Sequence, residues 1–86
     1  MNELLFFYMK RCPHCKKAEN FLEELMQEER YANIPVRRVE ETEEKELAES
    51  YDYWYVPSFF LDGKKLHEGS PTMEDIKRVL ETALES

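Results

Sequence analysis

The sequence lacks any long apolar run. No stretch of its 86 residues approaches the ~20 apolar residues that a membrane-spanning helix needs. The segment 4–9 is apolar but short, and it predicts a β-strand. No basic region precedes an apolar run and a small-residue cleavage site, so we expect no signal peptide and a cytoplasmic location. Repeats, linkers and low-complexity segments are also absent, so we expect one domain over residues 1–86.

Excess positive charge is lacking as well. The formal net charge is −7, which argues against a nucleic-acid partner, because such partners are bound through a basic surface. Acidic side chains gather in segments such as Glu40–Glu49, where we expect them to lie in solvent and keep the protein soluble. The local exception is a basic group around the cysteines, formed by Lys10, Arg11, His14, Lys16 and Lys17.

Cysteine is scarce: the chain contains only Cys12 and Cys15. A structural zinc site needs about four ligands, and the only other soft ligands are His14 and His67. We therefore expect no metal site within one chain, while a metal ion or iron–sulfur cluster shared between two chains stays open. A purely structural disulfide is not expected either, since closing so short a loop constrains the unfolded chain little.

The most informative feature that is present is Cys12-Pro13-His14-Cys15, between an expected strand and an amphipathic helical pattern. A C-x-x-C in this setting is typical of dithiol–disulfide chemistry. The first turn of a helix has unpaired N–H groups and a partial positive charge, which lower the pKa of a thiol there to roughly 3.5–7.5. We therefore expect Cys12 to be the nucleophile and Cys15, one turn further on, to resolve the mixed disulfide.

The hydrophobic periodicity predicts the element order βαβαββα. The initial strand–helix–strand favours a parallel pair with a right-handed crossover, and Asp62-Gly63 favours a hairpin. Thr42 is the expected N-cap of the second helix, and Thr72 with Asp75 resembles a capping box before the third. The result is a mixed four-stranded sheet flanked by three helices. The expected strands are 3–9, 36–40, 58–61 and 64–68, and the helices are 13–29, one beginning at 42, and 72–84.

This order, with two motifs at matching positions, resembles the thioredoxin fold in its minimal, glutaredoxin-like form. The motifs are the C-P-H-C segment and Val56-Pro57 directly before the third strand. The resemblance covers nearly the whole chain and implies an α/β fold. It also implies a cis Val56–Pro57 bond in a loop that faces Cys12. The backbone of Val56 would then offer its N–H and C=O to a substrate backbone, as an added strand does.

The resemblance further implies a thiol–disulfide oxidoreductase that works through a redox-active Cys12–Cys15 disulfide and holds no permanent cofactor. Pro13 is expected to stiffen the turn between the cysteines. His14, which makes the motif similar to that of periplasmic disulfide-forming oxidases, is expected to stabilise the Cys12 thiolate; the alternative is an exposed helix residue. The residues expected to bind substrate are Tyr8, Lys10, Arg11, Val56, Pro57, Gly69 and Ser70.

The expected partners of this monomer are a disulfide-containing client protein and a reductant. Glutaredoxins usually have a glycine pair where this chain has only Gly69, and their lysine stands one residue further from the first cysteine than Lys10 does. These departures favour thioredoxin reductase as electron donor, with glutathione as the alternative. A non-catalytic interaction module and a metal- or cluster-binding protein also remain open. Trp54 and its neighbouring tyrosines either form a partner surface or pack under the Val56–Pro57 loop.

Overall fold

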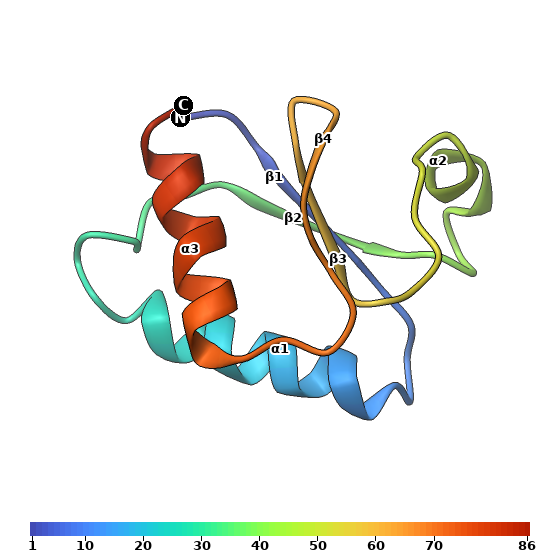
Figure 1. The fold of residues 1–86 in the computed structure, drawn as a ribbon, viewed down its shortest axis with the longest axis horizontal. Coiled ribbons are helices and arrows are strands. Elements are labelled where there is room, and N and C mark those ends of the chain that lie inside the picture. The colour runs from blue at the N-terminus through green and yellow to red at the C-terminus, as the bar shows by residue number, and fades with distance from the viewer.

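The fold is a four-stranded mixed sheet with three helices, seen in a computed structural model of Met1–Ser86. The strand order is β2-β1-β3-β4, in which β1 and β2 are parallel and the other neighbours are antiparallel. The predicted order βαβαββα is present (Figure 1). The strands are β1 (Leu4–Tyr8), β2 (Val36–Glu40), β3 (Ser58–Leu61) and β4 (Lys64–Glu68), and the helices are α1 (Pro13–Leu25), α2 (Lys45–Glu49) and α3 (Met73–Leu84).

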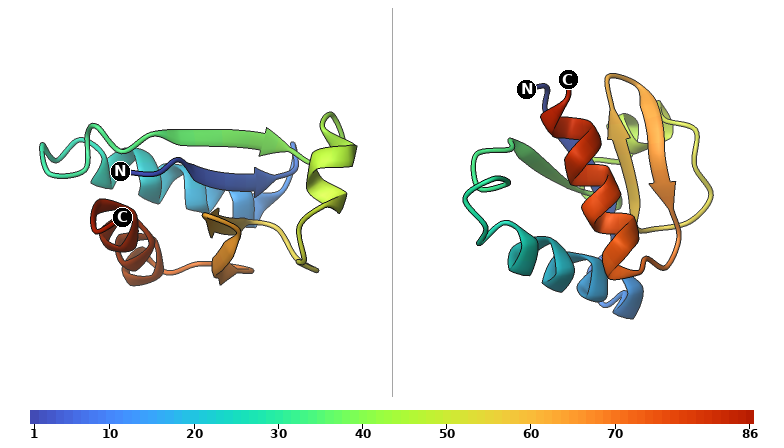
Figure 2. Two further views of the ribbon diagram at one scale, coloured as in Figure 1. Left: turned by 90° about the horizontal axis from the view of Figure 1, so that it is seen from above. Right: turned by 60° about the vertical axis from the view of Figure 1, so that its left-hand side comes forward.

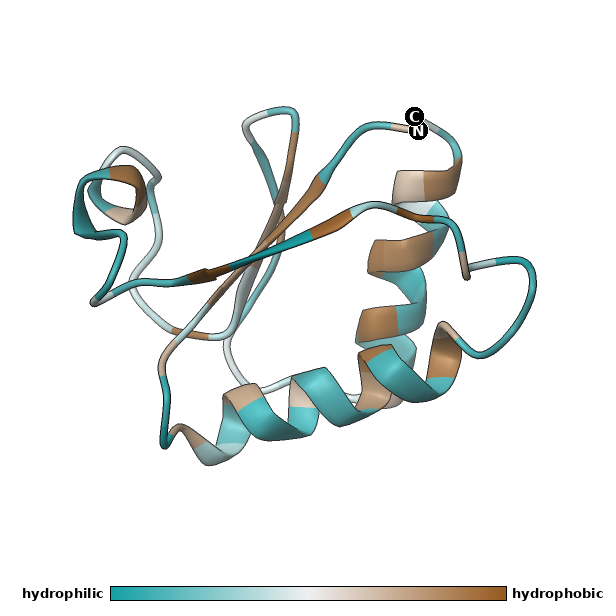
Figure 3. Ribbon diagram, turned by 180° about the vertical axis from the view of Figure 1, so that it is seen from behind, coloured by the Kyte–Doolittle hydropathy of each residue, from teal (hydrophilic) through white to brown (hydrophobic).

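The larger part of the core lies between the sheet and the two long helices. Both α1 and α3 pack on the same face of the sheet (Figure 2). Their apolar residues recur with helical spacing, so each helix turns one stripe toward the strands (Figure 3). In the sheet, the rings of Phe6 and Phe59 stack with their centroids 4.6 Å apart. The buried helical side chains are Ala18, Leu22 and Leu25 of α1 and Ile76, Val79, Leu80 and Ala83 of α3.

A smaller aromatic cluster lies on the opposite face of the sheet, beside α2. Phe7 and Phe60 are its buried strand residues. Tyr51 and Tyr53, which follow α2, each pack against Phe7 with ring centroids 5.0 Å apart. Burial of Phe7 on this face and Phe6 on the other shows that β1 is covered on both sides, as its continuous apolar sequence predicted.

Two local sequence signals form the expected structures. Asp62 and Gly63 both have positive φ, 52° and 79°, and they close the hairpin between β3 and β4 as an Asp-Gly turn does. At the start of α3, the Thr72 side chain accepts from the Asp75 N–H, while the Asp75 carboxylate accepts from the Thr72 N–H. This is the predicted capping box, with Asp in the usual place of Glu.

Two predicted helix boundaries were wrong. The first helix ends at Leu25 rather than near Glu29, because the following amides bond three residues back in tight turns, as in Glu28 N–H to Leu25 C=O. The second helix begins at Lys45 with no side-chain cap. Thr42 is not its N-cap, because both its N–H and its hydroxyl donate to the carboxylate of Glu40.

The two termini lie side by side at one end of the molecule (Figure 1). The Asn2 N–H donates to the Ser86 hydroxyl at 2.9 Å, so a hydrogen bond joins the first and last segments of the chain. None of the three helices has the length and apolar character needed to cross a membrane.

Candidate redox site

The central strand β1 leads directly to the C-P-H-C segment. β1 runs between β2 and β3, so its position is fixed on both sides by ladder hydrogen bonds. Residues 9–11 then connect it to α1, whose first residue is Pro13. A proline is tolerated there because the first helical N–H has no intrahelical partner. Cys12 therefore lies between the end of the central strand and the first residue of a helix.

Cys12 is the N-cap of α1. Its backbone is extended, with φ −98° and ψ 111°, and its Sγ accepts a hydrogen bond from the N–H of Cys15 at 3.2 Å. The thiol thus takes the place that a serine or aspartate oxygen takes in an ordinary cap. The sulfur therefore lies beside a backbone N–H donor, at the positive end of the helix. Cys12 is also partly exposed and lines a cleft.

Cys15 lies one turn further along α1 in a different environment. It is 3% exposed. Burial, followed by the hydrogen bond with Cys12 and the negative charge of Glu41, raises the pKa of Cys15 to about 12. The N–H of Met9 opposes this rise. At neutral pH Cys15 is therefore held as the protonated thiol.

The connection between β1 and Cys12 is held by Glu40 at the end of β2. One carboxylate oxygen accepts from the Lys10 N–H at 3.0 Å, and the other accepts from the N–H and hydroxyl of Thr42 at 2.6 and 2.7 Å. These bonds, that from Lys10 most, lower the pKa of Glu40 to about 2. The expectation that Glu40 lies in solvent with the other acidic residues is wrong, because its side chain is buried. Its carboxylate accepts from the N–H groups of Lys10 and Thr42, which have no backbone carbonyl as partner.

Arg11 has a left-handed backbone, with φ 66°. This region is uncommon for residues other than glycine, asparagine and aspartate. The turn places Cys12 at the head of α1 immediately afterwards. Neither Arg11 nor the exposed Lys16 forms an ion pair, whereas Lys10 pairs with Glu43. The uncompensated positive charge beside the cysteines is thus carried by residues next to Cys12 and in the first turn of the helix.

His14 is exposed in the first turn of α1 and forms no hydrogen bond with Cys12 in this structure. Its expected effect on the thiolate stays a prediction. The other histidine lies on β4, where the Nε2 of His67 is 3.0 Å from the carbonyl oxygen of Gly69. No three side chains of His, Cys, Asp or Glu lie close enough to hold one metal ion within the chain.

The Val56–Pro57 loop lies at the same end of the sheet as the cysteines. The register pairs Phe7 with Ser58, so the end of β1 and the start of β3 are adjacent. The Val56–Pro57 peptide bond is cis, and Pro57 is fully buried. The carbonyl of Pro57 accepts from the Gly69 N–H at 2.8 Å. The N–H and C=O of Val56 have no partner in the protein, while its side chain packs against the smaller core cluster.

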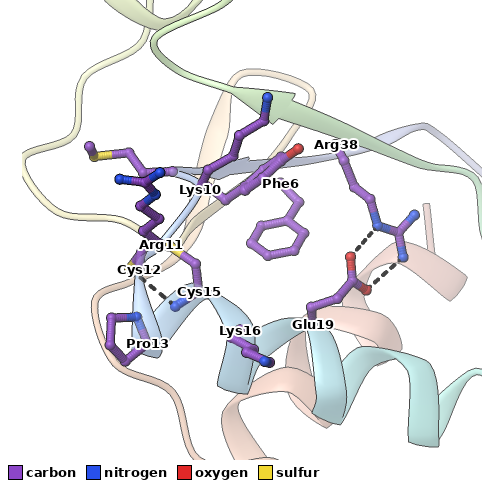
Figure 4. A pocket seen from close by; sticks show the side chains of 11 residues that line it. Phe6, Lys10, Arg11, Cys12, Pro13, Cys15, Lys16, Glu19 and Arg38 are labelled. Carbon is purple, nitrogen blue, oxygen red and sulfur yellow. Dashed lines mark hydrogen bonds and ion pairs between the residues drawn. The ribbon is translucent and has the colours of Figure 1, made fainter.

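A cleft of about 530 Å³ opens beside the two cysteines. Figure 4 shows its lining, in which Cys12 and Cys15 lie at one end and the side chains of Glu19 and Arg38 at the other. Three predicted substrate residues, Tyr8, Lys10 and Arg11, line this cleft. The others, Val56, Pro57, Gly69 and Ser70, do not.

The Glu19–Arg38 pair was not foreseen from the sequence. Its two bonds, at 2.5 and 2.8 Å, join α1 to β2 across the cleft. Because the expected parallel pairing puts β2 beside β1, the alternation of Arg38 with buried Val39 could have indicated a basic side chain on the face covered by α1.

The comparisons with known proteins agree with this architecture. Residues 6–81 match the family model described as "Thioredoxin domain". The chain belongs to the thioredoxin domain family and is a thioredoxin-like small redox protein with an α/β fold. No significant match to a curated protein was found.

Solved structures of thioredoxins have the same fold. A mutant thioredoxin from Halobacterium salinarum is 26% identical, with a TM-score of 0.71, and the match covers 98% of this chain and 75% of that one. The oxidised thioredoxin from Plasmodium falciparum is 21% identical, with a TM-score of 0.71 and coverages of 93% and 78%. A structure described as that of a malarial protein has a TM-score of 0.72 at 18% identity and covers 93% of each chain.

Proposed function

We propose that the protein is a thiol–disulfide oxidoreductase that reduces disulfides of client proteins. The observation that carries the proposal is the asymmetry of the two thiols. Cys12 is partly exposed and accepts the Cys15 N–H at the start of α1, whereas Cys15 is buried and its pKa is raised to about 12. The Cys12 sulfur is thus suited to attack a client disulfide, while Cys15 stays a protonated thiol until the mixed disulfide has formed.

The reaction proceeds in two exchanges. The Cys12 thiolate attacks one sulfur of the client disulfide, so a Cys12–client disulfide forms and the other client sulfur leaves as a thiolate that takes up a proton. Cys15 then loses its proton and attacks Cys12, which releases the second client thiol. The client disulfide is reduced to two thiols while Cys12 and Cys15 are oxidised to a disulfide. An external dithiol must then reduce that disulfide.

We propose a flavin-dependent thioredoxin reductase, rather than glutathione, as that dithiol source. Anionic groups such as the glutathione carboxylates bind well to clusters of free backbone N–H groups. After β4, the Gly69 N–H donates to Pro57, Pro71 has none, and the Thr72 N–H donates to Asp75. Only the N–H of Ser70 is left in this segment, which offers glutathione little. A monomeric state and a cytoplasmic location remain part of the proposal.

The test compares two reducing systems with the same disulfide substrate. NADPH consumption is followed with thioredoxin reductase, and separately with glutathione and glutathione reductase. We expect faster turnover in the first system, no turnover for Cys12→Ser in either, and accumulation of client mixed disulfides for Cys15→Ser. Turnover by glutathione alone would reverse the assignment of the donor. Zinc or a coloured cluster bound through Cys12 in the purified protein would contradict the proposal as a whole.

A further inference from the structure

We propose that Trp54 and Tyr55 form a docking surface for an apolar side chain of the client polypeptide, next to the disulfide that is to be reduced. This inference rests on the function proposed above and names the kind of client it serves. It concerns a polypeptide segment in extended conformation, because the surface continues directly into the unpaired backbone of Val56.

The aromatic segment after α2 divides into an inner and an outer pair. Tyr51 and Tyr53 pack on Phe7, whereas the side chains of Trp54 and Tyr55 are 86% and 70% exposed. The sequence allowed either packing or a partner surface; the structure packs Tyr51 and Tyr53 and leaves Trp54 and Tyr55 exposed. Adjacent large aromatic side chains this exposed are typical of interaction sites, where rings of this kind supply much of the binding energy.

The backbone of this exposed pair is fixed by one side chain. A single carboxylate oxygen of Glu68, on β4, accepts the N–H groups of both Trp54 and Tyr55, the latter at 2.8 Å. Its other oxygen accepts from Lys65 at 2.7 Å, and the Ser58 hydroxyl donates to the Tyr55 carbonyl at 2.5 Å. Lys65 and the two amides lower the pKa of Glu68 to about 2, so the carboxylate is charged throughout the neutral range.

A fixed backbone under exposed rings reduces the conformational entropy lost on binding. Packing of the loop on the core does not account for this fixed backbone, because Trp54 and Tyr55 are not part of either core cluster. Glu68 therefore acts as a positioning residue for the two rings.

The two rings directly precede the Val56–Pro57 loop, which lies at the same end of the sheet as the cysteines. Val56 follows Tyr55, and its side chain turns inward against the smaller core cluster while its N–H and C=O remain unpaired. A client strand that pairs with Val56 must continue over Tyr55 or Trp54 on one side of its cysteine. A small disulfide has neither a strand to pair with Val56 nor a side chain to place on either ring. The surface should therefore favour polypeptide clients with an apolar residue near the cysteine.

Trp54 is the only tryptophan, so its fluorescence reports docking directly. In the Cys15→Ser variant, Cys12 is coupled to a short peptide whose single cysteine carries a 2-nitro-5-thiobenzoate leaving group. The peptides differ only in one position near the cysteine, leucine in one and serine in the other. We expect a blue-shifted emission with protection from acrylamide quenching for the leucine peptide alone. Equal spectra for the two peptides would overturn the proposal, as would a shift with protein concentration alone, which indicates a second copy as the occupant.

Kinetics provide the second test, with wild-type cysteines. For the Trp54→Ala/Tyr55→Ala variant, we expect the rate constant with the leucine peptide disulfide to fall about tenfold, equivalent to ~1.4 kcal/mol. Rates with the serine peptide and with hydroxyethyl disulfide should change less than about twofold, a span of under ~0.5 kcal/mol. Trp54→Phe/Tyr55→Phe should restore most of the rate. Glu68→Ala should lose the same selectivity and lower the fluorescence anisotropy of Trp54.

The small disulfide separates the two proposals. If wild type reduces hydroxyethyl disulfide but treats the two peptides alike, the docking surface is wrong and the proposed activity stands. If the rates with all three substrates fall equally in the double variant, the rings act on the site in general and the docking proposal is also wrong. Failure of wild type to reduce any of them would overturn both.

Discussion

The carboxylate of Glu40 accepts the backbone N–H of Lys10 at 3.0 Å, two residues before Cys12. Glu40 ends β2 and Lys10 follows β1, so this contact joins the ends of two parallel strands at the redox site. The same side chain also accepts both polar groups of Thr42. A buried carboxylate with several N–H and O–H donors is a stable anion, and it fixes the path of the chain into Cys12.

Replacing Glu40 should therefore destabilise the protein in a pH-dependent way. The folded protein lowers the pKa of Glu40 from its usual 4.5 to about 2. The stabilisation by this group is thus complete above pH 4.5 and is lost as the pH falls toward 2. Glu40→Ala should reduce the free energy of unfolding at pH 7, with a difference from wild type that shrinks as the pH approaches 2. Urea denaturation at several pH values measures this.

The matched control for Glu40 is Glu44→Gln. Glu44 pairs with Arg37 at the surface, and such a pair contributes little, in the range of ~0–1 kcal/mol. Its replacement should leave the pH profile of stability close to that of wild type. Equal profiles for the two variants would show that Glu40 is not the anchor inferred from its hydrogen bonds.

Alkylation should distinguish the two cysteines sharply. Burial raises the pKa of Cys15 to about 12, so its thiolate is scarce at pH 7, and burial also hinders the reagent. In the reduced protein, iodoacetamide should label Cys12 at neutral pH long before Cys15. Mass spectrometry of proteolytic fragments gives the two rates. In urea-unfolded protein the two cysteines should react alike, and preferential labelling of Cys15 in the folded protein would sink the assignment of roles.

The features that the sequence predicted well are those that depend on local patterns. The alternation and spacing of apolar residues placed every strand and both long helices. Asp62-Gly63 marked the hairpin between β3 and β4, and Thr72 with Asp75 marked the start of α3. What it missed depends on neighbours distant in the chain. Glu40 accepts a hydrogen bond from Lys10, which lies 30 residues earlier in the chain, and no local pattern separates it from the exposed glutamates that follow.

Tyr31 is the clearest residue of this second kind. It follows the end of α1, outside any periodic segment, yet it is 1% exposed and its hydroxyl donates to Glu81 of α3 at 2.7 Å. A tyrosine in a polar loop gives no sign that it anchors the loop in the main core. Its ring belongs to the main core cluster, together with residues of α1 and α3 that lie far from it in the chain.

The two parts of the Tyr31 side chain should contribute very differently to stability. Tyr31→Phe removes one hydrogen bond and should lower the free energy of unfolding by about 1 kcal/mol. Tyr31→Ala removes a buried ring as well, for which losses of about 3–5 kcal/mol are usual. Chemical denaturation gives both values. Tyr55→Phe, at an exposed ring, is the control and should change stability by less than ~0.5 kcal/mol; a loss as large as that of Tyr31→Phe would contradict the anchoring role.

Arg11 combines an unfavourable backbone with a favourable charge, and substitutions can separate the two. Its φ of 66° costs an ordinary residue ~1–2 kcal/mol, from which glycine is exempt. Glycine gives back part of this gain, ~0.5–1 kcal/mol, through the greater freedom of the unfolded chain. Arg11→Gly should thus be as stable as wild type or up to ~1 kcal/mol more stable, whereas Arg11→Ala keeps the strained backbone and should show no gain.

Both remove the unpaired guanidinium beside Cys12, so both should reduce peptide disulfides flanked by aspartate more slowly than wild type does, with little change for peptides flanked by serine. The denaturation midpoint follows the backbone and the ratio of the two peptide rates follows the charge. If the ratio changed only in the variant whose stability changed, the arginine would act through the conformation of the turn and not through its charge.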